Sequence, residues 1–261
     1  MKSVNPFLLR VLGIRRGPPA NRLGLLYLCL ERAASVVVLA LIGLHAFPQM
    51  LFAHSLESGG VTIHSPSALP PQTQEVIRQT EALVRASELA VPGRSEHAFV
   101  SSERWRVWLF KPFSRSFAFS VPITDNIFVA DADVALNRSR GSESVAGPRT
   151  LSSVLAHEIT HGLVRSRLGA VRAARLPAWL NEGYCDYVAR ESSFAEEEGR
   201  RLLRQGETHP SNSFRYFVYR EMVRHLIEDR GMRFDDMVAI ADDGDAVRAE
   251  MVAALRARYR D

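Results

Sequence analysis

The amino-acid sequence predicts an α+β fold in which one N-terminal transmembrane helix precedes a small β-sheet and a mainly helical domain. Three observations support this fold class. Residues 33–53 contain no Asp, Glu, Lys or Arg over 21 positions. Short runs rich in β-branched and aromatic residues follow between 97 and 130. From 151 onward, apolar residues recur at helical spacing. Because the strands precede the helices and do not alternate with them, a parallel α/β sheet is not expected.

The uncharged segment 33–53 is long enough to cross about 30 Å of hydrocarbon as a helix. Residues 1–32 form a basic flank, with Glu31 as the one acidic residue against Lys2, Arg10, Arg15, Arg16, Arg22 and Arg32. This flank predicts a single-pass protein of the inner (cytoplasmic) membrane, with a cytoplasmic N-terminus and a periplasmic or extracellular main domain. A cleaved signal peptide and a buried core helix are the alternatives.

The formal net charge of +4 is concentrated in this flank, which leaves −1 for everything after Ala53. A nearly neutral main domain argues against binding to nucleic acid. The two cysteines, Cys29 and Cys185, lie on opposite sides of the expected span. We therefore expect no intramolecular disulfide, and no cysteine-based zinc site is evident.

Residues 54–72 are rich in Ser, Gly and Pro and are predicted to be a linker, so that one domain covers 73–261. This domain opens with a helix over 73–89. Strands are expected at His97–Val100, Trp105–Phe110, Phe117–Ser120 and Asn126–Ala130, and a polar loop at Asn137–Arg149. Helices are expected near 151–168, 178–192, 194–205, 213–229 and 244–259.

The most informative stretch contains the motif H-E-x-x-H as His157, Glu158 and His161. On a helix, residues four apart lie on the same face, so two imidazoles can bind one metal ion. Glu158 projects to the side and can act on a metal-bound water without being a ligand. Thr150 and Gly169 are suitable ends for this helix. Two histidines that are simply hydrogen-bonded in the core are the structural alternative.

A catalytic zinc ion takes three protein ligands and keeps an open fourth position. Glu182 offers the third ligand, because Pro177 can begin a second helix that folds back antiparallel to the first. Asp186 stands one turn after Glu182 and can accept the free ring N–H of a ligand histidine. A solvated surface residue is the alternative for Asp186.

With H-E-I-T-H followed by N-E-G-Y-C-D, the segment from Arg149 to Arg190 resembles the gluzincin metallopeptidases, the group of the thermolysin-like peptidases and the aminopeptidases related to leukotriene hydrolase. The resemblance implies a zincin-like domain that binds one zinc ion and hydrolyses peptide bonds. It assigns zinc binding to His157, His161 and Glu182, and the general base to Glu158. Asp186 matches the aspartate that supports a ligand histidine, and Asn181 the asparagine that precedes the glutamate ligand.

The sequence departs from the aminopeptidases of this group in two ways. Twenty residues separate His161 from Glu182, slightly more than in those enzymes, and the amine-binding motif G-x-M-E-N is absent. These departures favour an endopeptidase acting on a peptide or protein substrate. A catalytically inactive binding or scaffolding module, and a zinc hydrolase of a non-peptide amide, are the alternative functions.

Two further features concern the substrate. The oxyanion of the reaction needs a hydrogen-bond donor, for which Tyr216 is favoured over Tyr219, His209 and His225, although an aromatic residue in this segment also suits the core. Asn126–Ala130 is expected to be an edge strand that pairs with an extended peptide, with an internal strand as the alternative.

Overall fold

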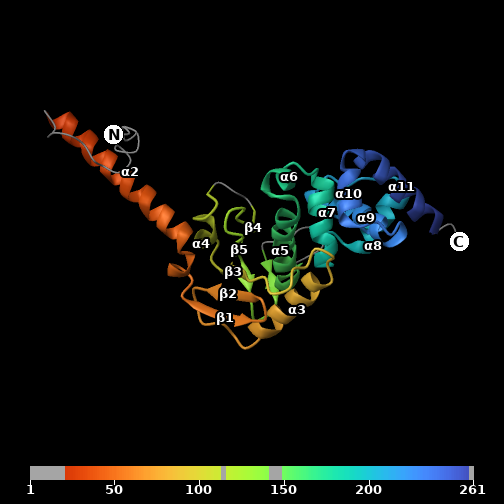
Figure 1. The fold of residues 1–261 in the computed structure, drawn as a ribbon, viewed down its shortest axis with the longest axis horizontal. Helices are drawn as coiled ribbons and strands as arrows, with labels where there is room; N and C mark the ends of the chain where they lie inside the picture. The colour runs from red at the N-terminus through yellow and green to blue at the C-terminus, as the bar shows by residue number, and fades with distance from the viewer. Residues whose placement is uncertain (1–20, 113–115, 141–148, 259–261) are drawn as a thin grey trace. The chain divides into compact units, whose positions relative to one another are not determined.

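The computed structural model describes residues 21–112, 116–140 and 149–258 (Figure 1). The chain divides into two compact units, Met1–Met50 and Leu51–Asp261. In the first unit, helix α2 (Arg22–Ala46) is followed by the 3-10 helix η1 (Pro48–Met50). Asn21 begins α2, because its side-chain oxygen accepts a hydrogen bond from Gly24 N at 2.8 Å.

Helix α2 is long and apolar enough to cross a membrane, and it buries none of its residues. The absence of buried residues contradicts the core-helix alternative. The predicted bounds of 33–53 are wrong at both ends: the helix runs through Glu31 and Arg32, because charged residues do not interrupt helical hydrogen bonding, and it ends before Pro48. The basic residues Lys2, Arg10, Arg15 and Arg16 of the expected cytoplasmic segment lie outside the described residues.

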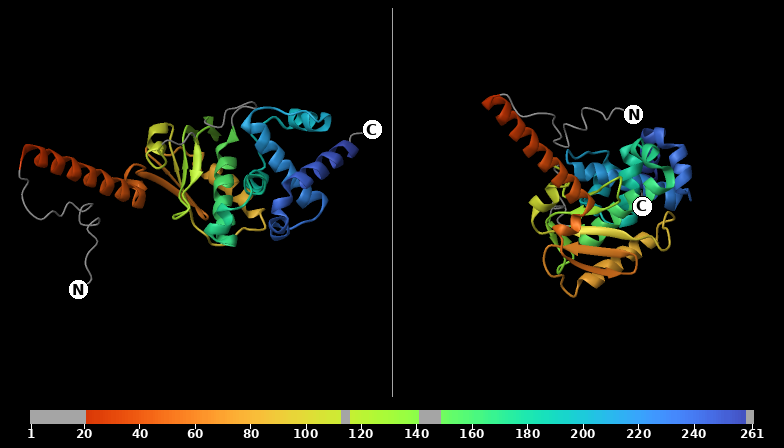
Figure 2. Two further views of the ribbon diagram at one scale, coloured as in Figure 1. Left: turned by 90° about the horizontal axis from the view of Figure 1, so that it is seen from above. Right: turned by 60° about the vertical axis from the view of Figure 1, so that its left-hand side comes forward.

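The second unit begins with a five-stranded mixed sheet in the order β1-β2-β3-β5-β4. Its strands are β1 (His54–Ser58), β2 (Val61–Ser65), β3 (Glu96–Val100), β4 (Ala118–Ser120) and β5 (Ile127–Val129). The pairs β1–β2 and β4–β5 are antiparallel, whereas β2–β3 and β3–β5 are parallel. With helices following the sheet, the α+β class is confirmed (Figures 1 and 2).

Three local predictions in this region are wrong. The first half of the expected linker 54–72 is the β1–β2 hairpin, because Gly59 supplies a turn with φ 59° between alternating apolar residues. The run Trp105–Phe110 is not a strand: most of it belongs to helix α4 (Arg104–Trp108), and its two buried apolar residues, Val107 and Phe110, are three positions apart. Asn126–Ala130 holds β5, which lies between β3 and β4 and is therefore internal, while β4 is the edge strand.

The two faces of the sheet are covered differently. Apolar side chains of β2, β3 and β5 pack against helices α3 (Thr73–Arg85) and α5 (Leu151–Leu168) in one core cluster. Because side chains alternate along a strand, the other face carries a different set, which is aromatic. Phe99, Phe119 and Phe128 stack there, and Phe52 and Phe110 cover them. We call these five residues the aromatic layer.

Among the described residues that follow the five-stranded sheet, a three-stranded sheet of two-residue strands comes first and the later elements are helices, as predicted. The short strands are β6 (Ala132–Asp133), β7 (Arg138–Ser139) and β8 (Arg149–Thr150). Residues 141–148 of the expected polar loop lie outside the described residues. The remaining helices are α6 (Ala170–Ala174), α7 (Ala178–Ala189), α8 (Glu196–Gln205), α9 (Asn212–Arg224), the π-helix η3 (His225–Asp229), α10 (Phe234–Ala239), the 3-10 helix η4 (Ala241–Asp243) and α11 (Gly244–Arg258).

Helices α7 and α9 approach each other unusually closely at Gly183. A Cβ atom at this position would lie 2.5 Å from the carbonyl oxygen of Tyr219. Only glycine permits this contact between the backbones, and the contact fixes α7 against α9.

Candidate metal centre

Helix α5 carries both histidines of the motif and ends where the sequence predicts. The Oγ1 of Thr150 accepts a hydrogen bond from Ser153 N at 3.2 Å, and Gly169 ends the helix with φ 79°. Residues 151–160 are all buried, so α5 runs through the interior between the sheet and α7. His157 and His161 stand one turn apart, with ring centroids 4.9 Å from each other.

Glu182 on α7 lies close to both histidines of α5. The Oε2 of Glu182 lies 3.3 Å from Nε2 of His157 and 3.5 Å from Nε2 of His161. Zinc binds such ligands at about 2.0–2.1 Å, which separates the corners of its tetrahedron by about 3.3–3.4 Å. Both distances from Oε2 of Glu182 are close to one edge of such a tetrahedron, so Glu182 is placed to share a zinc ion with the two histidines.

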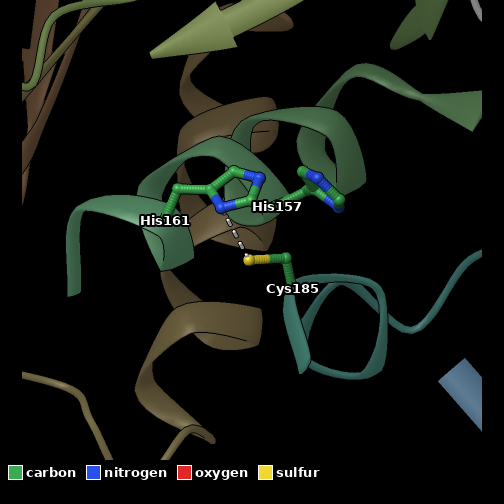
Figure 3. A group of neighbouring side chains, drawn as sticks. All are labelled: His157, His161 and Cys185. Carbon is green, nitrogen blue, oxygen red and sulfur yellow. Dashed lines mark hydrogen bonds between the residues drawn. The ribbon is translucent and has the colours of Figure 1, made fainter. Parts of the chain in front are cut away.

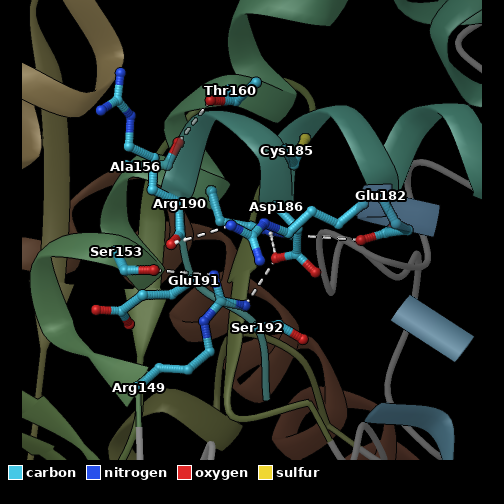
Figure 4. Close-up of polar contacts among 12 residues, drawn as sticks. Arg149, Ser153, Ala156, Thr160, Glu182, Cys185, Asp186, Arg190, Glu191 and Ser192 are labelled. Atoms are coloured by element: carbon cyan, nitrogen blue, oxygen red, sulfur yellow. Dashed lines mark hydrogen bonds and ion pairs between the residues drawn. The ribbon is translucent and has the colours of Figure 1, made fainter. Parts of the chain in front are cut away.

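Behind His157 lies a buried chain of charges. Its Nδ1–H donates to Oδ1 of Asp186 at 2.8 Å, and Nη1 of Arg149 donates to the same oxygen at 2.8 Å. Arg149 also donates to Oγ of Ser153 (Figure 4). Asp186 is almost fully buried, so it is not the solvated surface residue that the sequence left as an alternative. Its contact turns Nε2 of His157 toward Glu182.

The protonation of these groups follows from their proximity. Burial alone would lower the pKa of His157, but the carboxylates of Asp186, Glu182 and Glu158 raise it to about 10. Burial alone would raise the pKa of Glu182. The imidazoles of His157 and His161 have the larger, opposite effect, so the pKa of Glu182 is lowered. Arg149 and His157 likewise lower the pKa of Asp186 against the effect of its burial. In the absence of a metal, a proton on His157 thus compensates the surrounding carboxylates, and a divalent cation would replace it.

His161 has different neighbours. Its Nδ1 lies 3.3 Å from Oδ1 of Asn181 and 3.3 Å from Sγ of Cys185, which points toward the ring (Figure 3). His157, His161 and Cys185 form a group that could hold a metal ion. Burial, followed by the nearby carboxylates, raises the pKa of Cys185. A thiol must lose its proton to bind a metal, so this environment favours Glu182 as the third ligand.

The donor atoms line a cavity of about 480 Å³ that also contains Glu158 and Tyr216. Burial, followed by the carboxylate of Glu182, raises the pKa of Tyr216 to about 12, which keeps its phenol protonated and able to donate a hydrogen bond. The other oxyanion candidates lie elsewhere. Tyr219 and His209 line a different cavity, and His225 pairs with Asp229 at 2.7 Å.

Edge strand β4 forms one wall of the same cavity. It is held beside α5 by Arg165, which donates to Oδ1 of Asp125 at 2.7 Å and to Oγ of Ser120 at 3.1 Å. The backbone pairs Phe117–Ala130 and Val121–Asn126 are hydrogen-bonded. In an antiparallel pair these bonds alternate. The N–H and C=O groups of the residues at 118 and 120 therefore point away from β5, toward the open edge.

Sequence reasoning missed two members of the site. Arg149 was expected only as the end of a polar loop, and Cys185 was assigned no role. Nothing local in the sequence marks Arg149, because its partner Asp186 lies 37 positions away. For Cys185 a signal existed: it follows Glu182 by three positions and so lies near it on a helix.

No protein-family model matches this chain, and no curated protein matches its sequence significantly. The geometry of the site therefore carries the functional argument.

Proposed function

We propose that this protein is a membrane-anchored zinc peptidase of the gluzincin type with a zincin-like domain. One observation carries the proposal: Oε2 of Glu182 lies 3.3 Å from Nε2 of His157 and 3.5 Å from Nε2 of His161, and the three residues line a cavity that Glu158 also lines. A structural cluster of hydrogen-bonded histidines needs neither an open cavity nor a free carboxylate beside it. Both are requirements of hydrolysis.

The chemistry follows from the position of each side chain. His157, His161 and Glu182 would hold one zinc ion, which when bound activates water and polarises the scissile carbonyl. Glu158 accepts a proton from the attacking water and returns it to the leaving amine. The protonated phenol of Tyr216 donates a hydrogen bond to the oxyanion. Asp186, held by Arg149, keeps the ring of His157 in its binding orientation.

The open edge of strand β4 favours the proposal that the enzyme is an endopeptidase. An extended peptide can pair with the outward N–H and C=O groups of Ala118 and Ser120 and so place a mid-chain carbonyl in the cavity. Pairing through the backbone requires no free N-terminus, which agrees with the absence of the motif G-x-M-E-N. Helix α2 is proposed to anchor the domain on the outer side of the cytoplasmic membrane.

Substitution at Ala118 tests this account of substrate binding. Ala118→Pro removes one outward donor on an edge strand, where proline is tolerated. Losing one hydrogen bond should lower kcat/KM about 2–10-fold, with zinc content unchanged. Ala118→Gly keeps the N–H group and serves as the matched control. N-terminally acetylated peptides should remain substrates. Blocked cleavage of acetylated peptides would show that the enzyme is an aminopeptidase and that this description of its cleft is wrong.

A further inference from the structure

Helix α4 presents tryptophan to solvent on one side and contributes to the core on the other. Val107 and Phe110, three residues apart, are buried. Trp105 and Trp108, also three residues apart, are 52% and 45% exposed. They are two of the three tryptophans in the chain. Two half-exposed indole rings on one helical turn form a local apolar patch, and such patches can mark a contact with a membrane or another protein.

A short stretch of chain joins α2 to the aromatic layer. Phe110, two residues after the end of α4, packs against Phe52 in the aromatic layer, with ring centroids 6.2 Å apart. Phe52 comes six residues after Ala46, the last residue of α2. Six residues span at most about 22 Å. If α2 crosses a membrane, as proposed above, Phe52 of the aromatic layer is therefore tethered to the end of that helix by no more than about 22 Å of chain.

The chemistry of the exposed face suits the headgroup region of a bilayer. Tryptophan combines an apolar ring system with an N–H donor and is enriched at this level of membranes. The charges nearby are nearly balanced: Arg104 pairs with Asp131 and Arg106 with Glu103, and Lys111 adds one positive charge. Such a face can approach phospholipid without strong repulsion or a strong requirement for anionic lipid.

We propose that Trp105 and Trp108 insert into the headgroup region of the bilayer that α2 crosses, so that the second unit has a peripheral lipid contact besides its covalent anchor. This inference rests on the proposed membrane anchor and extends it. Edge strand β4 begins ten residues after Trp108. The contact would hold the cleft near the bilayer and favour peptide segments that lie close to the membrane surface.

Fluorescence quenching in proteoliposomes tests the contact on the full-length chain. Vesicles contain phosphatidylcholine brominated near the headgroup end of its acyl chains, and wild type is compared with W105F/W108F. Only the buried Trp179 remains in the double variant. Wild type should show at least about twofold greater fractional quenching, because two of its three tryptophans would contact lipid. Adding anionic lipid should change this difference little.

Val171→Trp in the W105F/W108F background is the matched control, because Val171 is an exposed apolar residue on α6. Because the proposed contact involves α4 and not α6, this tryptophan should be quenched less than those of wild type. The lipid contact is overturned if wild type is quenched no more than W105F/W108F, or if the control is quenched as strongly as wild type. Alkaline extraction of the same vesicles tests the anchor separately. Release of the protein would refute both anchor and contact, whereas peptide hydrolysis in detergent reports on the active site alone.

Discussion

Replacing Arg149 by methionine tests whether the buried ion pair behind His157 holds the site together. Nη1 of Arg149 lies 2.8 Å from Oδ1 of Asp186, and the two side chains are only 7% and 2% exposed. Removing one partner of a buried pair costs about 3–5 kcal/mol, and Asp186 would be left with protonated His157 as its remaining partner of opposite charge. At about 2–4 °C per kcal/mol for a domain of this size, Arg149→Met should lower the Tm by about 6–20 °C.

Thermal unfolding of the metal-free protein, followed by circular dichroism, measures this effect. Arg140→Met is the matched control, because Arg140 also pairs with an aspartate, Asp133, but is 66% exposed. Loss of the Arg140–Asp133 ion pair should lower the free energy of unfolding by less than about 1 kcal/mol. The double variant R149M/D186N should recover much of the lost stability, because no buried charge is left unpaired. If Arg149→Met lowers the Tm no more than Arg140→Met, the buried pair does not have the role assigned to it.

Three further predictions concern packing, pH and topology. Gly183→Ala should lower the free energy of unfolding by about 1–3 kcal/mol and reduce activity, because its Cβ would meet the carbonyl oxygen of Tyr219. Gly162→Ala should have a smaller effect on stability, because its Cβ would meet the flexible end of an arginine side chain. Because the pKa of His157 is raised in the folded, metal-free protein, protonated His157 stabilises the fold fully below its ordinary pKa of 6.5, and this stabilisation is lost as the pH rises toward 10. The free energy of urea unfolding should therefore change less between pH 6 and pH 10 in His157→Gln than in wild type. A reporter active only outside the cytoplasm, fused after Asp261, should be active, and activity of a cytoplasmic reporter instead would contradict the orientation.

The parts of the fold that could be predicted from sequence depend on local signals. Helix α5 begins and ends as expected, because Thr150 and Gly169 act through hydrogen bonds and backbone angles within one turn. The two histidines share a face for the same reason, since their spacing is a property of the helix itself. The placement of Glu182 required one more step, that α7 folds back on α5, and the proline before α7 indicated where that helix begins.

The errors arise where the outcome depends on distant parts of the chain. The order of strands in the sheet is not local, so β5 was assigned to the edge that β4 occupies. A local signal did exist: the continuous apolar run Ile127–Val129 is typical of a strand buried on both faces. Helix α4 was read as a strand because its tryptophans have high strand propensity, but the packing of Val107 and Phe110 outweighs that preference.

The most direct test of the proposed function is to measure zinc content and peptide hydrolysis together in wild type and in Glu158→Gln. We expect about one zinc ion per chain in both proteins, because Glu158 is not a ligand, and loss of cleavage of an internally quenched peptide only in the variant. Glu182→Gln should lower the zinc content as well. Zinc binding without peptide cleavage by wild type would favour a binding module, or a hydrolase of other amides if those are cleaved. A zinc-free wild type, or a Glu158→Gln protein that still cleaves peptides, would contradict the account.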